Sequence, residues 1–386
     1  AHAYERIALN LIVSGGGLVC FIASNNVQKY LDEDIALTKP TYLIAVPRVL
    51  NIFHQKIMTL FNELSGEARS EVDKAIEAKR EEFKRSGSYL HTTYDRTIFS
   101  KIRERYGGNI KYFLTASAPL PTGIANDLKI FFSVPIVESY GMTEIGLLTV
   151  THFNDPQNGN TGGPLRTMTY KLADRKELNY HSETEFEGLP SPTGEIYAKG
   201  VNVFKGYFMD TEKTQETFDE EGWVKSGDIG RVLPGNKGLQ IIDRVKEIFK
   251  LQQGVYLAPA KLESAYIKSK FCLQICVYGN SHHNYIIAIV VPNRSTLTSF
   301  LEKKGKLKPG DNIESFFTDS DLISAVQADF DALAKDNNFN SMEKPKKFII
   351  SPTEFTVQNE MITPTLKLCR RKIQDYFQED INRLYL

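Results

Sequence analysis

Short apolar runs alternate, in the first part of the chain, with segments that carry helix signals. Residues 41–46, 110–115 and 130–137 are such runs, rich in β-branched and aromatic side chains, and they predict buried strands. Pro47 follows the first run and predicts a helix start, because a first helical turn leaves its own N–H groups unpaired. A strand followed by a helix is the order typical of an α/β fold.

Two further segments differ in their balance of apolar and charged positions. Residues 9–23 form an apolar stretch, but Ser14 and the glycines 15–17 interrupt it, and it is shorter than the roughly 18 residues that span a membrane. This stretch predicts a buried strand and turn.

Residues 65–107 are highly charged with scattered apolar positions, which predicts exposed amphipathic helices with a break at 86–88. Acidic and basic residues are mixed there, so a solvated face is expected rather than a membrane-binding one.

The pattern changes after residue 166. Between 166 and 243, short strands alternate with turns, which predicts a small β subdomain. Its last strand ends on Asp243-Arg244, where we place the boundary between two domains, 1–243 and 244–386. The second domain is expected to contain a helix near 259–269, strands at 273–278 and 285–291, a charged helical stretch and a strand at 348–350.

Length and charge narrow the class of protein. The 386 residues allow two or three domains of roughly 150 residues each. Lys+Arg and Asp+Glu number 47 each, and the lack of net positive charge argues against a nucleic-acid-binding surface.

The cysteines indicate the compartment. There are four, sparsely spaced, which is typical of a reduced intracellular environment. Cys272 and Cys276 have neither a second pair nor a nearby His cluster, so a zinc site is not expected. The first six residues lack a signal-peptide pattern. We therefore expect a cytoplasmic protein or one bound peripherally to an organelle membrane, and the sequence leaves membrane attachment open.

The first candidate for chemistry is an Asp and an Arg on either side of the Pro/Gly-rich hairpin at 234–238. Asp228 precedes this hairpin and Arg244 follows it, so the two side chains can meet around one polar ligand. A carboxylate suits a ribose diol, because it accepts two hydroxyl hydrogen bonds at once. The alternative is a structural ion pair on a surface hairpin.

The second candidate is the sequence Tyr140-Gly141-Met142-Thr143-Glu144, which directly follows a predicted strand. Tyr140 offers a ring face to adenine, Gly141 permits close approach, and Thr143 can donate its hydroxyl to phosphate. Glu144 is a hard oxygen ligand suited to Mg²⁺. A turn before a helix is the alternative, but the ends of strands are where open α/β sheets bind ligands. After the preceding strand, the small residues Ser117, Ala118 and Pro119 would let a flat ligand approach the backbone.

A third motif lies near the end of the chain, where Thr363-Pro364-Thr365 precedes Leu366 and Lys367. A basic run at this place is in general more often a helix end. The three motifs together resemble those of the long-chain fatty acyl-CoA synthetases, which belong to the adenylate-forming superfamily with luciferases and peptide-synthetase adenylation domains. The resemblance rests on YGMTE, GWVKSGDIG, IIDR and TPTLKLCR in this order, and it covers nearly the whole chain.

The resemblance implies a fold and a reaction. It implies a large N-terminal domain of mixed α/β sheets with a distorted β-barrel at about 166–243, and a small mobile α+β C-terminal domain with its hinge near Lys246. The implied reaction is ATP-dependent fatty acid activation. The fatty carboxylate attacks ATP to give acyl-AMP and pyrophosphate, and CoA then attacks acyl-AMP to give acyl-CoA and AMP. ATP, Mg²⁺ and CoA are the implied cofactors.

The resemblance also implies roles for single residues. Lys367 would bridge the α-phosphate and the fatty carboxylate, Glu144 would bind Mg²⁺ and Thr143 would contact phosphate. Gly254 would line the tunnel for the pantetheine of CoA. The remaining nucleotide contacts would be Asp228 and Arg244 on the ribose, with Tyr140, Gly141 and the backbone of Ser117, Ala118 and Pro119 around adenine.

One part of the family pattern is missing. A Gly/Ser/Thr-rich phosphate loop matches no stretch of the chain, since Ser14 and the glycines 15–17 lack its Thr and Lys. We expect this loop upstream of His2 in a longer protein, and we expect the chain alone to be inactive. His2 could approach a substrate carboxylate, with a solvated terminal histidine as the alternative. Ser226 replaces the commoner Thr, and Val245 interrupts a usual basic pair.

Two other functions stay open at this point. One is another adenylate-forming ligase, acting on a short-chain, aryl or amino acid. The other is a non-catalytic lipid-binding relative, against which the intact Glu144, Asp228, Arg244 and Lys367 argue. Acyl chain length and oligomeric state cannot be predicted from the sequence.

Overall fold

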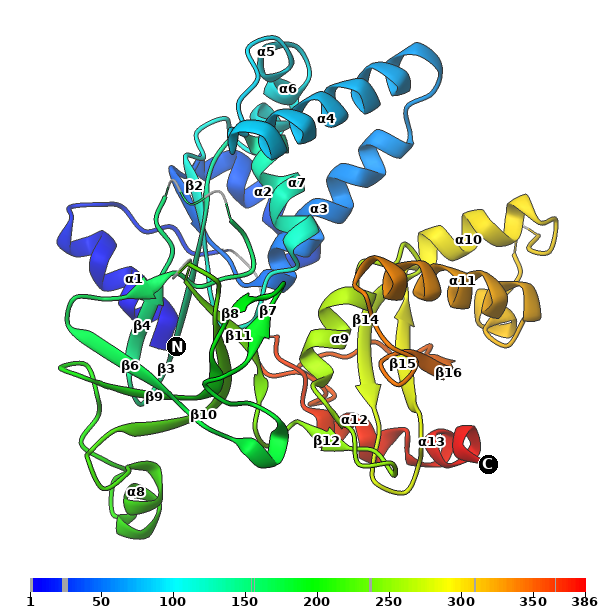
Figure 1. Cartoon of the computed structure of the whole chain (residues 1–386). Coiled ribbons are helices and arrows are strands. Elements are labelled where there is room, and N and C mark those ends of the chain that lie inside the picture. Colours follow the sequence, from blue (N-terminus) through cyan, green and yellow to red (C-terminus); the bar gives the residue numbers. More distant parts are fainter. Residues whose placement is uncertain are drawn as a thin grey trace. The chain divides into compact units, whose positions relative to one another are not determined.

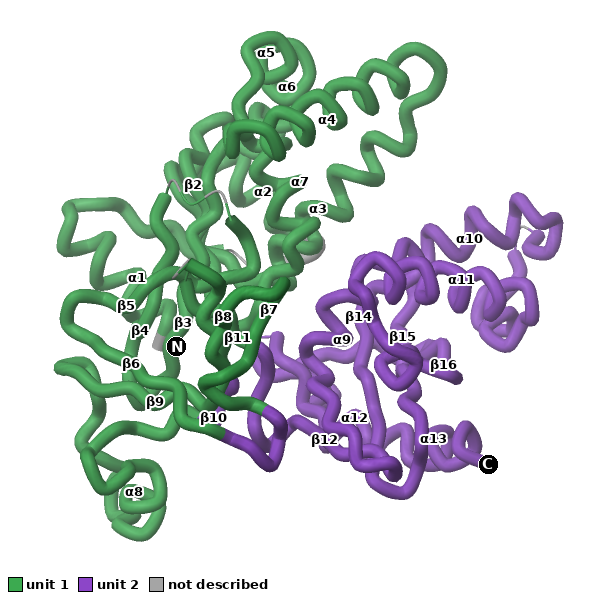
Figure 2. The backbone as a smooth tube through the Cα atoms, in the orientation of Figure 1, with its two compact units in different colours: residues 1–174, 180–226, 230–241 green, residues 175–179, 227–229, 242–386 purple. Residues whose placement is uncertain are grey.

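The computed structural model describes residues 3–22, 27–153, 155, 157–235, 238–308, 310–364 and 366–386. They form two compact units, shown in different colours in Figure 2. Unit 1 comprises Ala1–Asp174, Tyr180–Ser226 and Gly230–Ile241. Unit 2 comprises Arg175–Asn179, Gly227–Ile229 and Ile242–Leu386.

A five-stranded sheet in the order β1-β2-β3-β4-β5 lies at the centre of unit 1 (Figure 1). Its parallel strands are β1 (Tyr42–Ile44), β2 (Tyr112–Thr115) and β3 (Ile136–Met142). Its antiparallel strands are β4 (Gly146–Val150) and β5 (Gly163–Pro164). The strands predicted at 41–46 and 110–115 are thereby confirmed.

Helices α2, α3, α4, α6 and α7 of unit 1 pack at this sheet through a core rich in phenylalanine. Phe53 of α3 lies against Phe113 of β2 and Phe132 of α7, with ring centroids 6.4 and 6.3 Å away. Pro47 begins α3 as predicted, and the predicted break after α4 is made by Gly87, whose φ of 74° is left-handed. The helices are α1 (Ala3–Ser14), α2 (Val27–Thr38), α3 (Pro47–Asn62), α4 (Gly66–Ser86), α5 (Tyr94–Thr97), α6 (Phe99–Arg105), α7 (Thr122–Phe132) and α8 (Thr211–Thr217).

Two strand predictions for unit 1 are wrong. The stretch 9–23 was expected to be a buried strand and turn, but α1 continues to Ser14 and leaves Leu11 and Val13 mostly exposed. The run 130–137 was expected to be one strand, but its first three residues end α7, and β3 begins only at Ile136. In both places an apolar run was taken for a strand, although length and apolarity do not separate a strand from a short buried helix.

A second sheet has the strand order β11-β10-β9-β6. Its two edge strands, β11 and β6, are not hydrogen-bonded to each other, so the sheet is open. The barrel predicted for 166–243 is therefore not found among the described residues. The strands β10 and β11 on either side of the predicted hairpin are neighbours in this sheet, while residues 236 and 237 of the hairpin lie outside the described residues. The strands are β6 (Met168–Ala173), β9 (Thr193–Gly200), β10 (Val224–Val232) and β11 (Leu239–Arg244), with the small pair β7 (Glu185–Phe186) and β8 (Leu189–Pro190) beside them in the chain.

Unit 2 is built on a three-stranded sheet with a core on each face. The strands are β14 (Cys272–Tyr278), β15 (Ile286–Pro292) and β16 (Pro345–Ile350), as the sequence predicted within a few residues. Alternate residues of β15 face opposite cores, because Ile286 and Ala288 belong to one and Ile287 and Ile289 to the other.

Helices and short strands complete unit 2. The predicted helix near 259–269 is α9 (Pro259–Tyr266). The remaining elements are β12 (Phe249–Lys250), β13 (Tyr256–Leu257), α10 (Arg294–Lys303), α11 (Ser320–Asp336), α12 (Arg370–Tyr376), α13 (Gln378–Tyr385) and the 3₁₀ turns at Lys176–Leu178 and Ile313–Phe316. None of the helices in the described part of the chain combines the length and apolarity needed to cross a membrane.

Candidate active site

The first group of predicted residues follows β2 in unit 1. Ser117 has a left-handed φ of 88°, which an L residue rarely adopts. Its hydroxyl and that of Thr115 are both buried without a hydrogen-bond partner among the described residues. An unsatisfied buried hydroxyl costs about 1–3 kcal/mol, so these two fit a ligand that brings polar atoms to the carboxyl ends of the parallel strands. Ala118 and Pro119, next in the chain, are exposed. His2 lies outside the described residues.

Tyr140 and Gly141 end β3, and their surroundings change what the sequence suggested for them. Tyr140 is only 8% exposed and packs in a core cluster with Ile145 and Leu148, so little of its ring is open to a base. A Cβ added at Gly141 would lie 2.0 Å from the backbone oxygen of Gly146. The glycine is therefore required by the close approach of β3 and β4, whatever its contact with a ligand.

Glu144 lies with Thr143 in the tight turn between β3 and β4, so the motif precedes a strand and not a helix. Thr143 is exposed and Glu144 is half-buried. Tyr207 donates its hydroxyl to Oε1 of Glu144 at 2.7 Å, and the N–H of Phe204 donates to the backbone oxygen of Glu144 at 2.8 Å. The carboxylate is thus fixed in direction.

The surroundings of Glu144 decide which metal it suits. No group of three or more His, Cys, Asp or Glu that could hold a metal is found within the described ranges. A single carboxylate does not make a protein cage for a cation, but it fits Mg²⁺, which keeps several waters and binds through one or two carboxylates plus substrate phosphates.

The second group lies in unit 2. Nε of Arg244 lies 3.2 Å from Oδ1 of Asp228, so the two side chains meet across β10 and β11, as both interpretations of this pair require. The Asp228 side chain is 8% exposed and that of Arg244 is 55% exposed. A buried carboxylate beside an accessible guanidinium can hold a polar ligand at the rim of the pair.

Lys367 joins this pair from a distant part of the sequence. Its burial, and next the nearby Arg244, lower the pKa of the ammonium, whereas Asp228 and Glu247 act in the opposite direction. No carboxylate of the described residues lies within ion-pair distance of its Nζ. A partly desolvated ammonium that is not neutralised by a direct partner can bind an incoming anion strongly.

The backbone around Lys367 is held in a narrow turn. Thr363 donates its N–H to the Lys367 oxygen at 2.8 Å, and Lys367 donates its N–H to Oγ1 of Thr363 at 3.1 Å. Leu366 has a left-handed φ of 63° and packs against the second core of unit 2. Its anchored side chain offsets a backbone cost of about 1–2 kcal/mol and so fixes the turn that presents the lysine. Thr365 lies outside the described residues.

The predicted hinge and tunnel residues lie in turns of unit 2. Lys246 is exposed in the turn after β11, whose neighbour Val245 donates its N–H to the Gly227 oxygen at 2.8 Å. Gly254 is exposed in the turn between β12 and β13, with a φ of 89°. A Cβ there would meet only the Lys250 side chain, at 3.8 Å, so the position is strained for other residues but spacious.

Sequence reasoning missed a buried charge network behind Lys367. Arg370 donates two hydrogen bonds to Glu263 at 2.6 and 2.7 Å and one to Glu247, beside the predicted hinge, at 2.8 Å. Asp243 accepts from the N–H of Ala260 at 2.8 Å, and its burial raises its pKa to about 7. Only the three-dimensional fold brings these charges together, and their spacing in the sequence carries no signal.

Glu138 is a second missed residue, in β3 of unit 1. The residue is 6% exposed, and its carboxylate accepts a hydrogen bond from the N–H of Gly159 at 3.3 Å. Burial raises its pKa to about 7. It connects β3, the strand that carries Tyr140, to the loop between β4 and β5.

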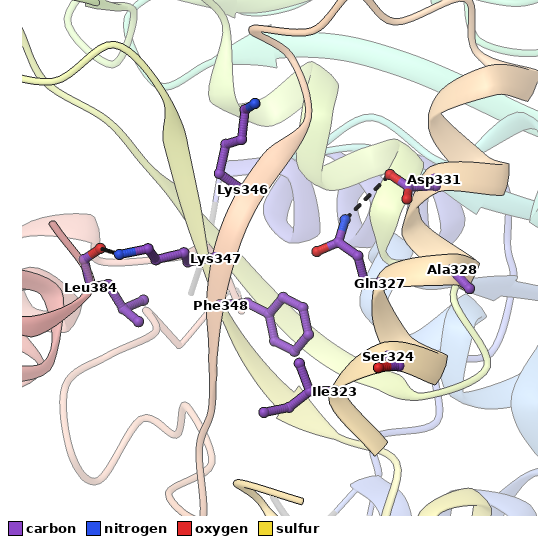
Figure 3. A pocket seen from close by; sticks show the side chains of 9 residues that line it. All are labelled: Ile323, Ser324, Gln327, Ala328, Asp331, Lys346, Lys347, Phe348 and Leu384. Atoms are coloured by element: carbon purple, nitrogen blue, oxygen red, sulfur yellow. Dashed lines mark hydrogen bonds between the residues drawn. The ribbon is translucent and has the colours of Figure 1, made fainter. Parts of the chain in front are cut away.

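A cavity of about 550 Å³ in unit 2 contains none of the predicted site residues. Figure 3 shows Ile323 of α11 close to Phe348 of β16 in its lining, with Gln327 hydrogen-bonded to Asp331. Lys347 donates to the backbone oxygen of Leu384 at 2.5 Å. The polar side chains Gln327, Asp331 and Lys347 of this cavity are thus bonded to neighbouring residues of unit 2.

Comparison with known proteins places the geometry in context. The family model for AMP-binding enzymes matches residues 1–208. Fatty acyl-CoA synthetase A of Dictyostelium discoideum is 35% identical over 386 residues, covering all of this chain and 56% of that protein. Long-chain-fatty-acid–CoA ligase 5 of Mus musculus is 35% identical over 391 residues, covering all of this chain and 54% of that protein. The chain thus spans about half the length of the curated relatives it matches.

Solved structures agree with the fold. The adenylation domain of a carboxylate reductase from Mycobacterium chelonae is 30% identical with a TM-score of 0.79, covering all of this chain and 52% of that domain. The corresponding domain from Segniliparus rugosus, solved with AMP and a co-purified carboxylic acid, is 29% identical with a TM-score of 0.75, covering all of this chain and 53% of that domain. The mixed α/β fold of this chain is that of adenylation domains.

Proposed function

The chain belongs to the AMP-binding, adenylate-forming enzymes, and on this premise we propose that the protein carrying it is an ATP-dependent long-chain fatty acid–CoA ligase. The proposal rests on the group formed by Asp228, Arg244 and Lys367 in unit 2. The cations Arg244 and Lys367 come from distant parts of the sequence and lie near the buried carboxylate of Asp228. The carboxylate suits the hydroxyl groups of a ribose, and the two cations suit a neighbouring phosphate. The similarity to a fatty acyl-CoA synthetase and to a long-chain-fatty-acid–CoA ligase supports the acyl substrate.

In the first step, the fatty carboxylate attacks the α-phosphorus of ATP and pyrophosphate leaves. Both reactants are anions, so the barrier is largely electrostatic. Lys367 would bind the α-phosphate and the carboxylate together, while Asp228 and Arg244 hold the ribose. Mg²⁺, when bound, supplies positive charge at the phosphates. Glu144 would hold it and Thr143 would donate to phosphate.

The adenine and the second step involve the remaining residues. Adenine would lie against the Ser117, Ala118 and Pro119 backbone, with Tyr140 and Gly141 shaping the wall behind it. The thiol of CoA then attacks the acyl carbonyl of acyl-AMP, and AMP leaves. In this proposal unit 2 contains the small mobile domain, Lys246 is its hinge, and Gly254 borders the path of pantetheine.

The experiment is pyrophosphate exchange with the full-length protein and a panel of acids: palmitate, acetate, benzoate and the amino acids. We expect exchange that depends on palmitate and Mg²⁺. Exchange with an aryl, short-chain or amino acid instead would support another adenylate-forming ligase. Palmitate binding without exchange would support a non-catalytic relative.

Lys367→Ala gives a sharper test of the assigned mechanism. Losing one charge that meets new negative charge in the transition state costs on the order of 3 kcal/mol, so pyrophosphate exchange should fall at least a hundredfold. Thioester formation from supplied acyl-AMP should be spared. Lys372→Ala is the control, because this exposed lysine pairs with Glu360 in the same region. An equal loss in both half-reactions would show that Lys367 is structural.

A further inference from the structure

The loop between β9 and α8 holds Glu144 at two points. Tyr207 donates its hydroxyl to Oε1 of the carboxylate at 2.7 Å, and Phe204 donates its N–H to the Glu144 backbone oxygen at 2.8 Å. All three residues belong to unit 1. Tyr207 and Glu144 lie 63 positions apart in the sequence, so only the fold brings them together.

Tyr207 is itself rigidly placed. Its N–H donates to Oγ1 of Thr214 at 2.9 Å, and its ring meets Phe204 edge-on with centroids 5.0 Å apart. The ammonium of Lys213 lies over the ring face, 4.7 Å from its centroid. A Cβ at Gly206 would come within 2.6 Å of the Thr214 side chain, so the chain can approach α8 only because residue 206 is glycine. The direction of the hydroxyl is therefore set by the surrounding packing.

The hydrogen bond leaves the two carboxylate oxygens of Glu144 unequal. Oε1 accepts from the phenol, and no other side chain in the described ranges donates to Oε2. A carboxylate held in this way presents one oxygen in a fixed direction.

We propose that Tyr207 is a positioning residue that orients Glu144 toward the Mg²⁺ of the bound nucleotide. The proposal rests on the proposed function, in which Glu144 is the protein ligand of Mg²⁺. Partners that orient a metal-binding carboxylate typically contribute 10- to 100-fold to metal affinity. In this proposal Tyr207 acts through its hydrogen bond to Glu144, so its effect is expected on metal binding.

The test is Tyr207→Phe in the full-length protein, which removes the hydroxyl and keeps the ring. ATP binding is measured by isothermal titration calorimetry over a range of Mg²⁺ concentrations without fatty acid, and thermal melting is recorded in parallel. We expect the Mg²⁺ concentration needed for half-maximal ATP affinity to rise at least tenfold, with an unchanged melting temperature. Pyrophosphate exchange should recover at high Mg²⁺. Tyr170→Phe is the control, because it removes a half-buried hydroxyl from β6 of the same unit.

Three outcomes overturn the proposal. In the first, ATP binding by Tyr207→Phe depends on Mg²⁺ concentration in the same way as ATP binding by Tyr170→Phe. In the second, Tyr207→Phe lowers the melting temperature and weakens ATP binding equally at all Mg²⁺ concentrations. In the third, Glu144→Gln leaves the Mg²⁺ dependence of ATP binding unchanged, which would show that Glu144 does not bind the metal. Failure of the proposed substrate is separate: altered Mg²⁺ dependence of ATP binding without palmitate-dependent exchange would uphold the role of Tyr207 and reject the fatty acid.

Discussion

At the scale of single residues, burial decides the chemistry of this chain more than residue type does. Glu144 and Glu138 are six positions apart, yet one is half-buried at a turn and the other is enclosed in β3. Desolvation disfavours the charged form of a carboxyl group, and it raises the pKa of Glu138 to about 7. The proton that Glu138 holds near neutral pH is therefore a property of the folded state.

The raised pKa of Glu138 predicts a pH-dependent stability. Between the ordinary pKa of a glutamate and about 7, the folded state keeps a proton that the unfolded chain has lost. The contribution of Glu138 to the free energy of unfolding is therefore complete at acidic pH and disappears as pH rises through 7. A shift of this size corresponds to ~3 kcal/mol. We expect Glu138→Gln to flatten the fall in melting temperature between pH 5 and 8.

Two comparisons make this test specific. Asp243, whose burial also raises its pKa to about 7, acts in the same direction, so only the difference between variant and wild type counts. Glu360→Gln serves as the matched control, because Glu360 is exposed. If the wild-type and Glu138→Gln curves ran parallel from pH 5 to 8, Glu138 would not hold the proton.

At the scale of elements, short turns place the site residues. The turn between β12 and β13 needs a left-handed residue at Gly254, and the turn from Thr363 to Lys367 uses a left-handed Leu366. Arg370 begins α12 directly after this second turn and ties it to Glu247 and Glu263. Each of these predicted site positions is thus fixed by an adjoining element with its own packing.

Two explanations of Gly254 can be tested: the position borders the path of pantetheine, or its backbone conformation requires glycine. Gly254→Leu adds bulk and strains the backbone, whereas Gly254→Asn adds a smaller side chain that tolerates φ > 0. If this position borders the path of pantetheine, both variants should keep pyrophosphate exchange and lose most acyl-CoA formation. Thermal melting should place Gly254→Asn near the wild type. A Gly254→Asn enzyme that makes acyl-CoA at the wild-type rate would show that only the backbone conformation matters.

At the scale of the whole molecule, the chain crosses from one compact unit to the other next to the predicted hinge. The main crossing falls between Ile241 and Ile242, and Lys246 lies in the exposed turn that follows β11. Asp228 and Arg244 lie before this position in the sequence, and Glu247, Arg370 and Lys367 lie after it. A rotation about Lys246 would therefore change the charges that surround Lys367.

Lys246→Pro tests whether such a rotation is needed. Proline fixes φ at this position and restricts Val245 before it, which should hinder the backbone change. We expect pyrophosphate exchange to continue while acyl-CoA formation falls at least tenfold. Lys246→Ala removes the same side chain without fixing φ and should support both half-reactions. Equal losses in the two half-reactions of Lys246→Pro would contradict the hinge.

Local signals in the sequence determined many elements of this protein. The apolar run at 41–46 became β1, Pro47 began a helix, and Gly87 ended one, because each depends on the conformational preferences of a few neighbouring residues. The motifs also identified the family, which is confirmed by the comparison with AMP-binding enzymes, whereas the roles of the single site residues stay predictions.

The tertiary structure alone decided which segments face each other. It made α1 from a stretch predicted to be a strand, and it left the sheet containing β6 open where a barrel was expected. It also joined Tyr207 to Glu144 and Arg370 to Glu247. Such contacts depend on how whole elements pack their apolar faces, and that packing is a property of the entire core rather than of any short run of residues.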